Sequence, residues 1–144
     1  MRQDVRADDV LVAGGAAAIV GGAPSTAHAV WRGRDPLEAS LAAGTLLLGR
    51  EERRGRLLLA ATVAHAALSF GWALVLAATL PRRRTVVAAA LAGLGIAALD
   101  LGVVGRRFPR IRALPLLPQV ADHVAYATTV GAVLARRRAQ RGRA

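Results

Sequence analysis

The residues of this sequence that could do chemistry are histidines and aspartates that lie within long apolar segments. His28, His65 and His123 are its three histidines, and Asp100 and Asp122 are carboxylates in similar surroundings. An Asp at the centre of a membrane helix costs about 2.5–3.5 kcal/mol on insertion scales, so a polar residue kept there is a functional candidate. We therefore treat these five residues as one candidate polar or ion site.

Two kinds of function could use these groups. One is transport, with Asp100 and Asp122 as charge carriers in a proton relay or cation site and His65 and His123 titrating near neutral pH. The other is haem binding, with His65 and His123 as axial ligands. An enzyme is not expected, because HExxH, GxSxG and a glycine-rich phosphate loop are absent. The chain has no cysteine, and we assign it no metal and no cofactor.

The same residues also have purely structural interpretations. Asp100 could pair with Arg106 or Arg107 on the loop side, and Asp122 could help to start its helix. Each histidine could bond a neighbouring carbonyl group. Small multidrug exporters have a similar size and four spans, but they rely on an acidic residue in the first span. The first span predicted here has none, so their mechanism is not carried over.

Four apolar segments must position these side chains. A membrane span needs about 20 mostly apolar residues, and the segments that meet or approach this length are 10–31, 57–80, 85–104 and 114–135. Pro24 should kink the first segment after Gly21-Gly22. Asp8 and Asp9 are predicted N-caps of the first segment, and Thr85 is the predicted N-cap of the third.

A shorter helix is predicted near 36–48, between the first two segments. Asp35 and Glu38 have the spacing of a capping box around Pro36, which suits a first helical turn. At about 13 residues the helix is too short to span, so we expect it to lie in the interface or to be re-entrant. A fifth span is the alternative.

The first segment could also be read as a signal peptide. Arg2 and Arg6 precede an apolar run, and Ala27-His28-Ala29 resembles a cleavage site. Against this interpretation, Asp4, Asp8 and Asp9 cancel the basic charge of the leader, and the run is rich in Gly rather than Leu. We expect the segment to be retained.

The segments alternate in direction, which brings the five candidate residues together. At 1.5 Å per residue, His65 lies about 12 Å into the second segment, and His28 and Asp100 lie about 5–6 Å from the ends of theirs. Asp122 and His123 lie early in the fourth. All five therefore fall in the same leaflet, the one opposite the termini.

Charge is concentrated in the loops. All 20 basic residues are arginines, against 9 acidic residues, for a net charge of +11. Their clusters flank apolar segments, which favours a membrane protein that meets anionic lipid head groups over one that binds nucleic acid. Ten arginines share a side with the termini (Arg2, Arg6 and those at 82–84, 136–138, 141 and 143), and ten lie opposite. The equal counts do not favour either orientation of the protein in the membrane. The two arginine triplets favour cytoplasmic termini. The balanced charge also permits insertion in both orientations.

An internal repeat is suggested by two pairs of segments. Ala64-His65 and Asp122-His123 correspond at an offset of 58, and His28 and Asp100 correspond at 72. Two tandem helical hairpins would give this pattern, and so would coincidence in an Ala-rich chain. Small residues also recur every four positions, which favours close helix packing within the chain and would also allow a homo-oligomer: Gly14, Ala18, Gly22; Ala89, Gly93, Ala97; Ala127, Gly131, Ala135.

Two stretches of the sequence carry a resemblance to known proteins: GGAPSTAHAVWRGRDPLEASLAAGTLLLG and ALDLGVVGRRFPRIRALPLLPQVADHVAYATTVGAVLA. With them, most of the chain resembles a group of small multi-pass membrane proteins of GC-rich bacteria. That group has no assigned activity, so the resemblance implies a membrane location and no chemistry.

These observations together predict one integral membrane domain over residues 1–144. Hydrophobic residues make up 54% of the chain but aromatic residues only 3%, whereas a soluble core of this size would use more aromatic side chains. We expect an all-α transmembrane four-helix bundle in the bacterial inner membrane. A non-enzymatic structural or accessory role is the leading hypothesis, and a small proton- or cation-coupled transporter is the alternative.

Overall fold

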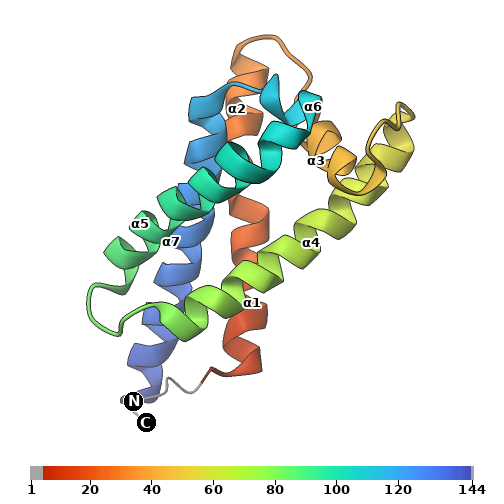
Figure 1. Ribbon diagram of the computed structural model, residues 1–144. Coiled ribbons are helices and arrows are strands. Elements are labelled where there is room, and N and C mark those ends of the chain that lie inside the picture. Colours follow the sequence, from red (N-terminus) through yellow and green to blue (C-terminus); the bar gives the residue numbers. More distant parts are fainter. Residues whose placement is uncertain (1–4, 144) are drawn as a thin grey trace.

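The computed structural model describes residues 5–143, which form helices joined by loops, with no strand among them. Arg2, which we counted among the arginines near the termini, lies outside the described residues. The long helices run between the two ends of the bundle, and the outer ends of α1 and α7 lie at the same end (Figure 1). The elements in order are α1 (Ala7–Val20), α2 (Ala23–Trp31), α3 (Glu38–Leu48), α4 (Arg54–Thr79), α5 (Thr85–Leu99), the π-helix η1 (Asp100–Val104), the 3₁₀ helix η2 (Gly105–Arg107), α6 (Pro109–Arg112) and α7 (Leu116–Arg141).

Three helical segments are long and apolar enough to cross a membrane: Ala7–Trp31, Arg54–Thr79 and Thr85–Arg107. They correspond to the predicted segments 10–31, 57–80 and 85–104. The fourth predicted segment, 114–135, forms most of α7 but does not meet the same hydropathy criterion. Gln119, Asp122 and His123 near its start and the arginines after residue 135 explain the difference.

The outer faces of the three apolar segments carry large hydrophobic side chains. Ile19 is 84% exposed, Leu59 69% and Leu91 64%. The interior is built mainly from alanine, with Ala13, Ala17, Ala73, Ala89 and Ala127 fully buried. Small residues inside and large apolar residues outside are typical of helices that pack against one another in lipid.

The helix α7 is the central element of the bundle. It packs along α5 and also contacts α1, α2 and α4, whereas α4 leans away from α5 beyond the loop that joins them (Figure 1). Glycines permit the close approach of α5 and α7: a Cβ on Gly93 would lie 2.8 Å from His123 O, and one on Gly131 would lie 2.5 Å from the Ala89 Cβ. Packing within the chain, the favoured interpretation of the small-residue faces, is confirmed for the faces that contain Gly93 and Gly131.

The short helix predicted near 36–48 is α3, which packs against the first half of α4. The contact is close at Gly44, where an added Cβ would lie 2.2 Å from Leu57 O. The predicted capping box does not form. The Asp35 carboxylate accepts the Leu37 N–H at 2.9 Å, while Glu38 binds Arg34 at 2.8 Å. Because this arginine is available one turn earlier, Glu38 pairs with it instead of closing the box.

The predicted N-caps of two other helices are also wrong. The first helix begins at Ala7 with Arg6 as its N-cap, so Asp8 and Asp9 lie inside its first turn. The third segment is preceded by Arg84 in a left-handed conformation, with φ of 54°. Thr85 is therefore the first helical residue, and its hydroxyl donates backwards to Pro81 O at 2.8 Å. In both cases the helix starts one to three residues earlier than the capping pattern suggests.

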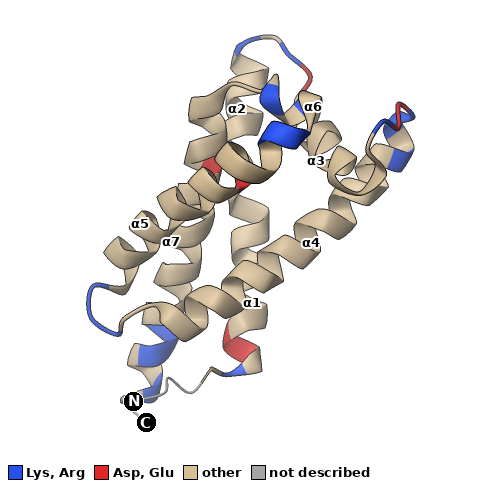
Figure 2. Ribbon diagram, in the orientation of Figure 1, with Lys and Arg blue, Asp and Glu red and all other residues tan. Residues whose placement is uncertain are grey.

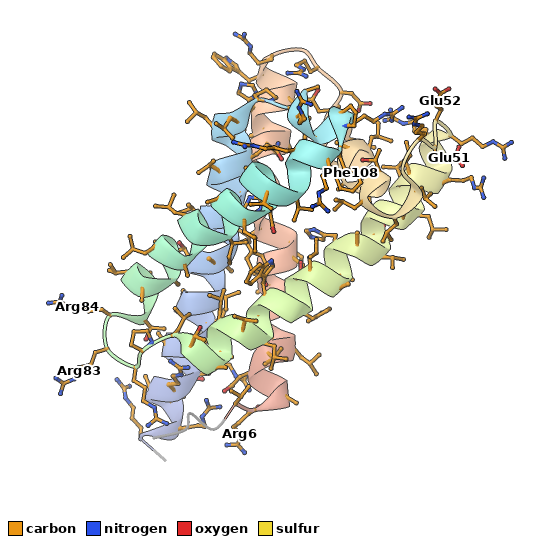
Figure 3. All side chains as sticks on the ribbon, viewed as in Figure 1. Arg6, Glu51, Glu52, Arg83, Arg84 and Phe108 are labelled. Carbon is orange, nitrogen blue, oxygen red and sulfur yellow. The ribbon has the colours of Figure 1, made fainter. Side chains whose placement is uncertain are left out.

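Arginines gather at the two ends of the bundle, and its middle is almost free of them (Figure 2). One end carries Arg6 and the loop 82–84, from which Arg83 and Arg84 project away from the helices (Figure 3). The other end carries the loops around α3 and α6, with Glu51 and Glu52 at its edge (Figure 3). The apolar length of the helices thus lies between two belts of positive charge.

Candidate functional site: a clamp on a broken helix

The first long helical segment is broken between α1 and α2, as predicted. Gly21 and Gly22 form a turn there, and Pro24 follows in the first turn of α2 without an amide hydrogen to donate. A break of this kind frees carbonyl groups before it and amide groups after it from their usual partners four residues away.

His65 binds one of the groups that the break sets free. In a continuous helix Ala18 O would accept the Gly22 N–H, but that bond is missing from the backbone hydrogen bonds of residues 5–143. Instead Ala18 O lies 2.9 Å from Nε2 of His65 on α4. A carbonyl oxygen can only accept, so Nε2 of His65 carries a hydrogen and donates it.

Asp122 binds a second freed group, on the other side of the break. The Ser25 N–H would reach back to Gly21 O in a continuous helix, and this bond is also missing within the described part of the chain. The amide donates instead to Oδ1 of Asp122 on α7, at 2.8 Å. Asp122 thus does for α2 what an N-cap side chain does, because the N-cap position itself is occupied by Gly22.

We call these four groups, the His65 and Asp122 side chains with Ala18 O and the Ser25 N–H, the kink clamp. Unpaired backbone groups cost several kcal/mol in an apolar surrounding, and membrane helices tolerate breaks where neighbouring helices supply new partners. The clamp supplies one partner from α4 and one from α7. It therefore stabilises the break and ties three long helical segments together.

His123 and Asp100 form a second polar contact, between α7 and the π-helix η1. Nε2 of His123 lies 3.2 Å from Oδ2 of Asp100, and its Nδ1 lies 2.7 Å from Gln119 O. The predicted pairing of Asp100 with Arg106 or Arg107 is wrong, since among the described residues its ion-pair partner is His123. The π turn explains this: Asp100 begins it and faces α7, whereas both arginines follow in η2.

Four of the five candidate residues come together and the fifth does not. Asp122 is close enough to interact electrostatically with both His123 and His65, and His123 contacts Asp100. These four residues therefore form one region, as the alternating directions of the segments predict. His28 lies elsewhere, edge-on to Trp31 with ring centroids 6.2 Å apart. It borders a shallow apolar hollow with Pro24, Pro115, Leu116, Leu117, Pro118 and Ala121.

Sequence reasoning missed a third polar contact, at the end of the bundle near the termini. Asp9 is buried and receives hydrogen bonds from Arg137 Nε at 2.5 Å and from both terminal nitrogens of Arg141, at 2.8 and 2.5 Å. The contact closes α1 against the last turns of α7. Its signal was present as two arginines four positions apart, which share one face of a helix.

A buried tyrosine was also overlooked. The Tyr126 hydroxyl on α7 donates to Ser69 O on α4. Tyrosine suits a position of this kind, because its ring fills apolar space while its hydroxyl finds a polar partner. Tyr126 and Asp122 lie four residues apart on α7, so one face of this helix supplies bonds to α4 and to α2.

The chemistry available to this region is proton exchange and hydrogen bonding. Within residues 5–143 no three His, Asp or Glu side chains are grouped closely enough to hold a metal ion. The donors and acceptors described above face one another or the backbone. The chain was also compared with known proteins, and no protein-family model, no curated protein and no solved structure matches it.

Proposed function

We propose that this chain is a non-enzymatic membrane protein with a structural or accessory role, whose interhelical polar residues hold its helices together. One observation carries the proposal: His65, Asp100, Asp122 and His123 each bond a group on the chain itself. A transport site needs polar groups that are free to exchange partners with a substrate, whereas these are occupied.

We further propose that α7 is the fourth membrane crossing. Between residues 118 and 135 only Ala121 and Ala132 are exposed, and the other residues are buried or half-buried by neighbouring helices. A helix surrounded by protein presents little surface to lipid, so it can cross with less hydrophobicity than its neighbours. Four crossings with arginine at both ends fit a multi-pass protein of the bacterial inner membrane that contacts anionic head groups. The arginine triplets support cytoplasmic termini.

A small proton- or cation-coupled transporter is the second candidate. The observation that favours it is the electrostatic connection of Asp122 with both His65 and His123, since chains of Asp and His can relay protons. In that mechanism the charge of Asp122 is essential. In the structural role its oxygen atom is essential, because that oxygen accepts the Ser25 N–H.

Two substitutions at Asp122 separate these functions. Asp122→Asn keeps an oxygen that can accept the Ser25 N–H but loses the charge, while Asp122→Leu loses both. For the structural role we expect proteoliposomes with an internal pH dye to show no proton flux above protein-free vesicles for wild type or either variant. We also expect Asp122→Asn to unfold near the wild-type temperature and Asp122→Leu to unfold lower.

The transporter predicts a different pattern. Wild type would conduct protons down an imposed gradient, and Asp122→Asn would be inactive although folded. Asp8→Asn is the matched control, because Asp8 is an exposed carboxylate in the first turn of α1. Flux that survives in Asp8→Asn and disappears in Asp122→Asn would overturn the structural proposal.

A further inference from the structure

The imidazole of His123 lies between two acceptors. Its Nδ1 is 2.7 Å from Gln119 O, one turn earlier in α7, and its Nε2 is 3.2 Å from Oδ2 of Asp100. A carbonyl oxygen only accepts, so Nδ1 must carry a hydrogen. A neutral imidazole has no second hydrogen, which leaves the contact with Asp100 one proton short.

That proton can reside on either partner. If it is on Nε2, an imidazolium donates to a carboxylate; if it is on Oδ2, a carboxylic acid donates to Nε2. In both arrangements the pair is neutral overall, which suits side chains that are only 20% and 24% exposed. Without the proton, a nitrogen lone pair would face a carboxylate, and the hydrogen bond would be lost.

The charged and titratable groups that face the pair come from α7, α2 and α4. Asp122, adjacent to His123 on α7, adds a second carboxylate, and α2 faces it with the Ser25 N–H rather than with a charge. From α4, His65 interacts with Asp122. If the proton were lost, the carboxylates of Asp100 and Asp122 would both be charged, and His123 would no longer be an imidazolium that compensates them.

The contact also holds a special piece of backbone. Asp100 starts the π-helix η1, and its carbonyl accepts the Gly105 N–H across a five-residue turn. Gly105 fits closely: an added Cβ would lie 2.9 Å from both Asp100 O and Ile111 Cγ2. Gly105 thus fixes the backbone of the π turn, and the side chain of Asp100 attaches this turn to α7. Single π turns in helices occur often at functional sites.

We propose that Asp100 and His123 form a proton-binding site, in which one proton shared by Nε2 and Oδ2 attaches η1 to α7, and that loss of this proton releases η1. The attachment is present at acidic and neutral pH and is lost as the pH rises past the point at which the pair gives up its proton. The site goes beyond the proposed function and does not depend on it, because its ligand is a proton whether or not the protein transports anything.

The protonation state can be read directly by NMR. Full-length protein with ring-¹⁵N histidine in detergent micelles at pH 7 should give a His123 ring with Nδ1 protonated and a second proton on or shared by Nε2. His28→Gln and His65→Gln variants assign the signals. In Asp100→Asn the side-chain amide can donate to Nε2, so the ring should become the neutral Nδ1–H form. A His123 ring that is neutral with its hydrogen on Nε2, or an imidazolium that persists in Asp100→Asn, would overturn the site.

Thermal unfolding between pH 6 and pH 9 tests the release. The unfolding temperature of wild type should fall by at least about 3 °C more than that of Asp100→Asn over this range. Asp8→Asn is the control, because Asp8 lies in the first turn of α1, away from the pair, and it should keep the wild-type slope. If Asp100→Asn does not fold, His123→Gln replaces it, because the Gln amide donates to Asp100 at every pH. Equal slopes for wild type and the substituted protein would show that the proton does not hold η1 in place.

Discussion

Asp122 on α7 accepts the backbone amide of Ser25 on α2 at 2.8 Å, across 97 positions of sequence. An ordinary N-cap comes from the residue before the helix and therefore fixes only local geometry. Here the capping oxygen belongs to a different helix, so the direction of α2 after the break is set by its contact with α7. The break in the first segment and the packing of the bundle are thus one structural feature.

Substitution of His65 should weaken the other half of the kink clamp. His65→Leu removes the donor to Ala18 O, and we expect a loss of about 0.6 kcal/mol, the average for hydrogen bonds between membrane helices, and at most about 1.7 kcal/mol. His65→Gln keeps a donor and should lose less. Unfolding in mixed micelles gives both values. Equal losses for the two variants would mean that the hydrogen bond is not what stabilises this contact.

The close approach of α5 and α7 gives a prediction with a control on the same helix. Gly93→Ala places a Cβ 2.8 Å from His123 O and 2.9 Å from Val124 Cα, and overpacking of this kind costs about 1–3 kcal/mol. Gly95→Ala meets nothing within 4 Å and should be neutral or slightly stabilising. Chemical unfolding of both variants measures the difference, and a Gly93→Ala protein as stable as Gly95→Ala would contradict this packing.

The stability that the ion cluster near the termini contributes should depend on Asp9 and not on Asp8. Breaking a fully buried ion pair costs about 3–5 kcal/mol, but the side chains of Arg137 and Arg141 are 28% and 35% exposed, so we expect about 1–3 kcal/mol for Asp9→Asn. The Asp8 side chain is 58% exposed, and Asp8→Asn should change stability by less than about 0.5 kcal/mol. The free energy of unfolding of both variants measures this difference, and equal losses would contradict the prediction.

The loop before α3 should change at low pH. The hydrogen bond from Arg54, together with the one from the Leu37 amide, lowers the pKa of Asp35 from 3.8 to about 2. Because the pKa is lowered in the folded protein, the contact contributes stability above pH 4 and loses it as the pH falls from about 4 to 2. The amide NMR signal of Leu37 should therefore titrate with a midpoint near 2. Asp35→Asn should abolish the transition, and a midpoint near 3.8 would show that Asp35 is unpaired in solution.

The proposed crossing by α7 can be tested with single cysteines, since the sequence contains none. Arg112 precedes α7 and Gln140 lies near its end, and both are exposed. In sealed vesicles, the fractions of Arg112→Cys and Gln140→Cys labelled by an impermeant maleimide should add up to the whole protein, even if both orientations occur. Arg32→Cys should match Arg112→Cys. Equal labelling of positions 112 and 140 in a uniformly oriented sample would place α7 on one side.

Much of the architecture could be predicted from hydropathy. Three apolar runs became three segments long enough to cross, because a continuous run of Leu, Val and Ala has few other stable solutions. The fourth, α7, was predicted as a helix, but its hydropathy is too low for the same criterion. Helix starts were predicted less well, because Asp9 formed ion pairs with Arg137 and Arg141 instead of capping.

The candidate site could be predicted as a region but not as a set of contacts. Alternation of direction placed Asp100, Asp122, His65 and His123 at one level, and four of the five candidates do gather there. Their partners could not be read from residue types, because two of them are backbone groups freed by the break at Gly21-Gly22. The π turn that aims Asp100 at α7 leaves no signal in hydropathy either.

The central position of α7 has a consequence for how the chain assembles. Its inner polar groups find their partners on α1, α2, α4 and η1, all of which precede it in the sequence. During synthesis the three apolar segments are complete before α7 emerges, and each can enter a bilayer on its own hydrophobicity. The helix α7 is less hydrophobic, so the crossing proposed for it requires partners that are already in place. Until α7 is in place, the break in the first segment lacks its cap and Asp9 lacks its arginines. The contacts that join the helices of the bundle are therefore completed only by the last long helix.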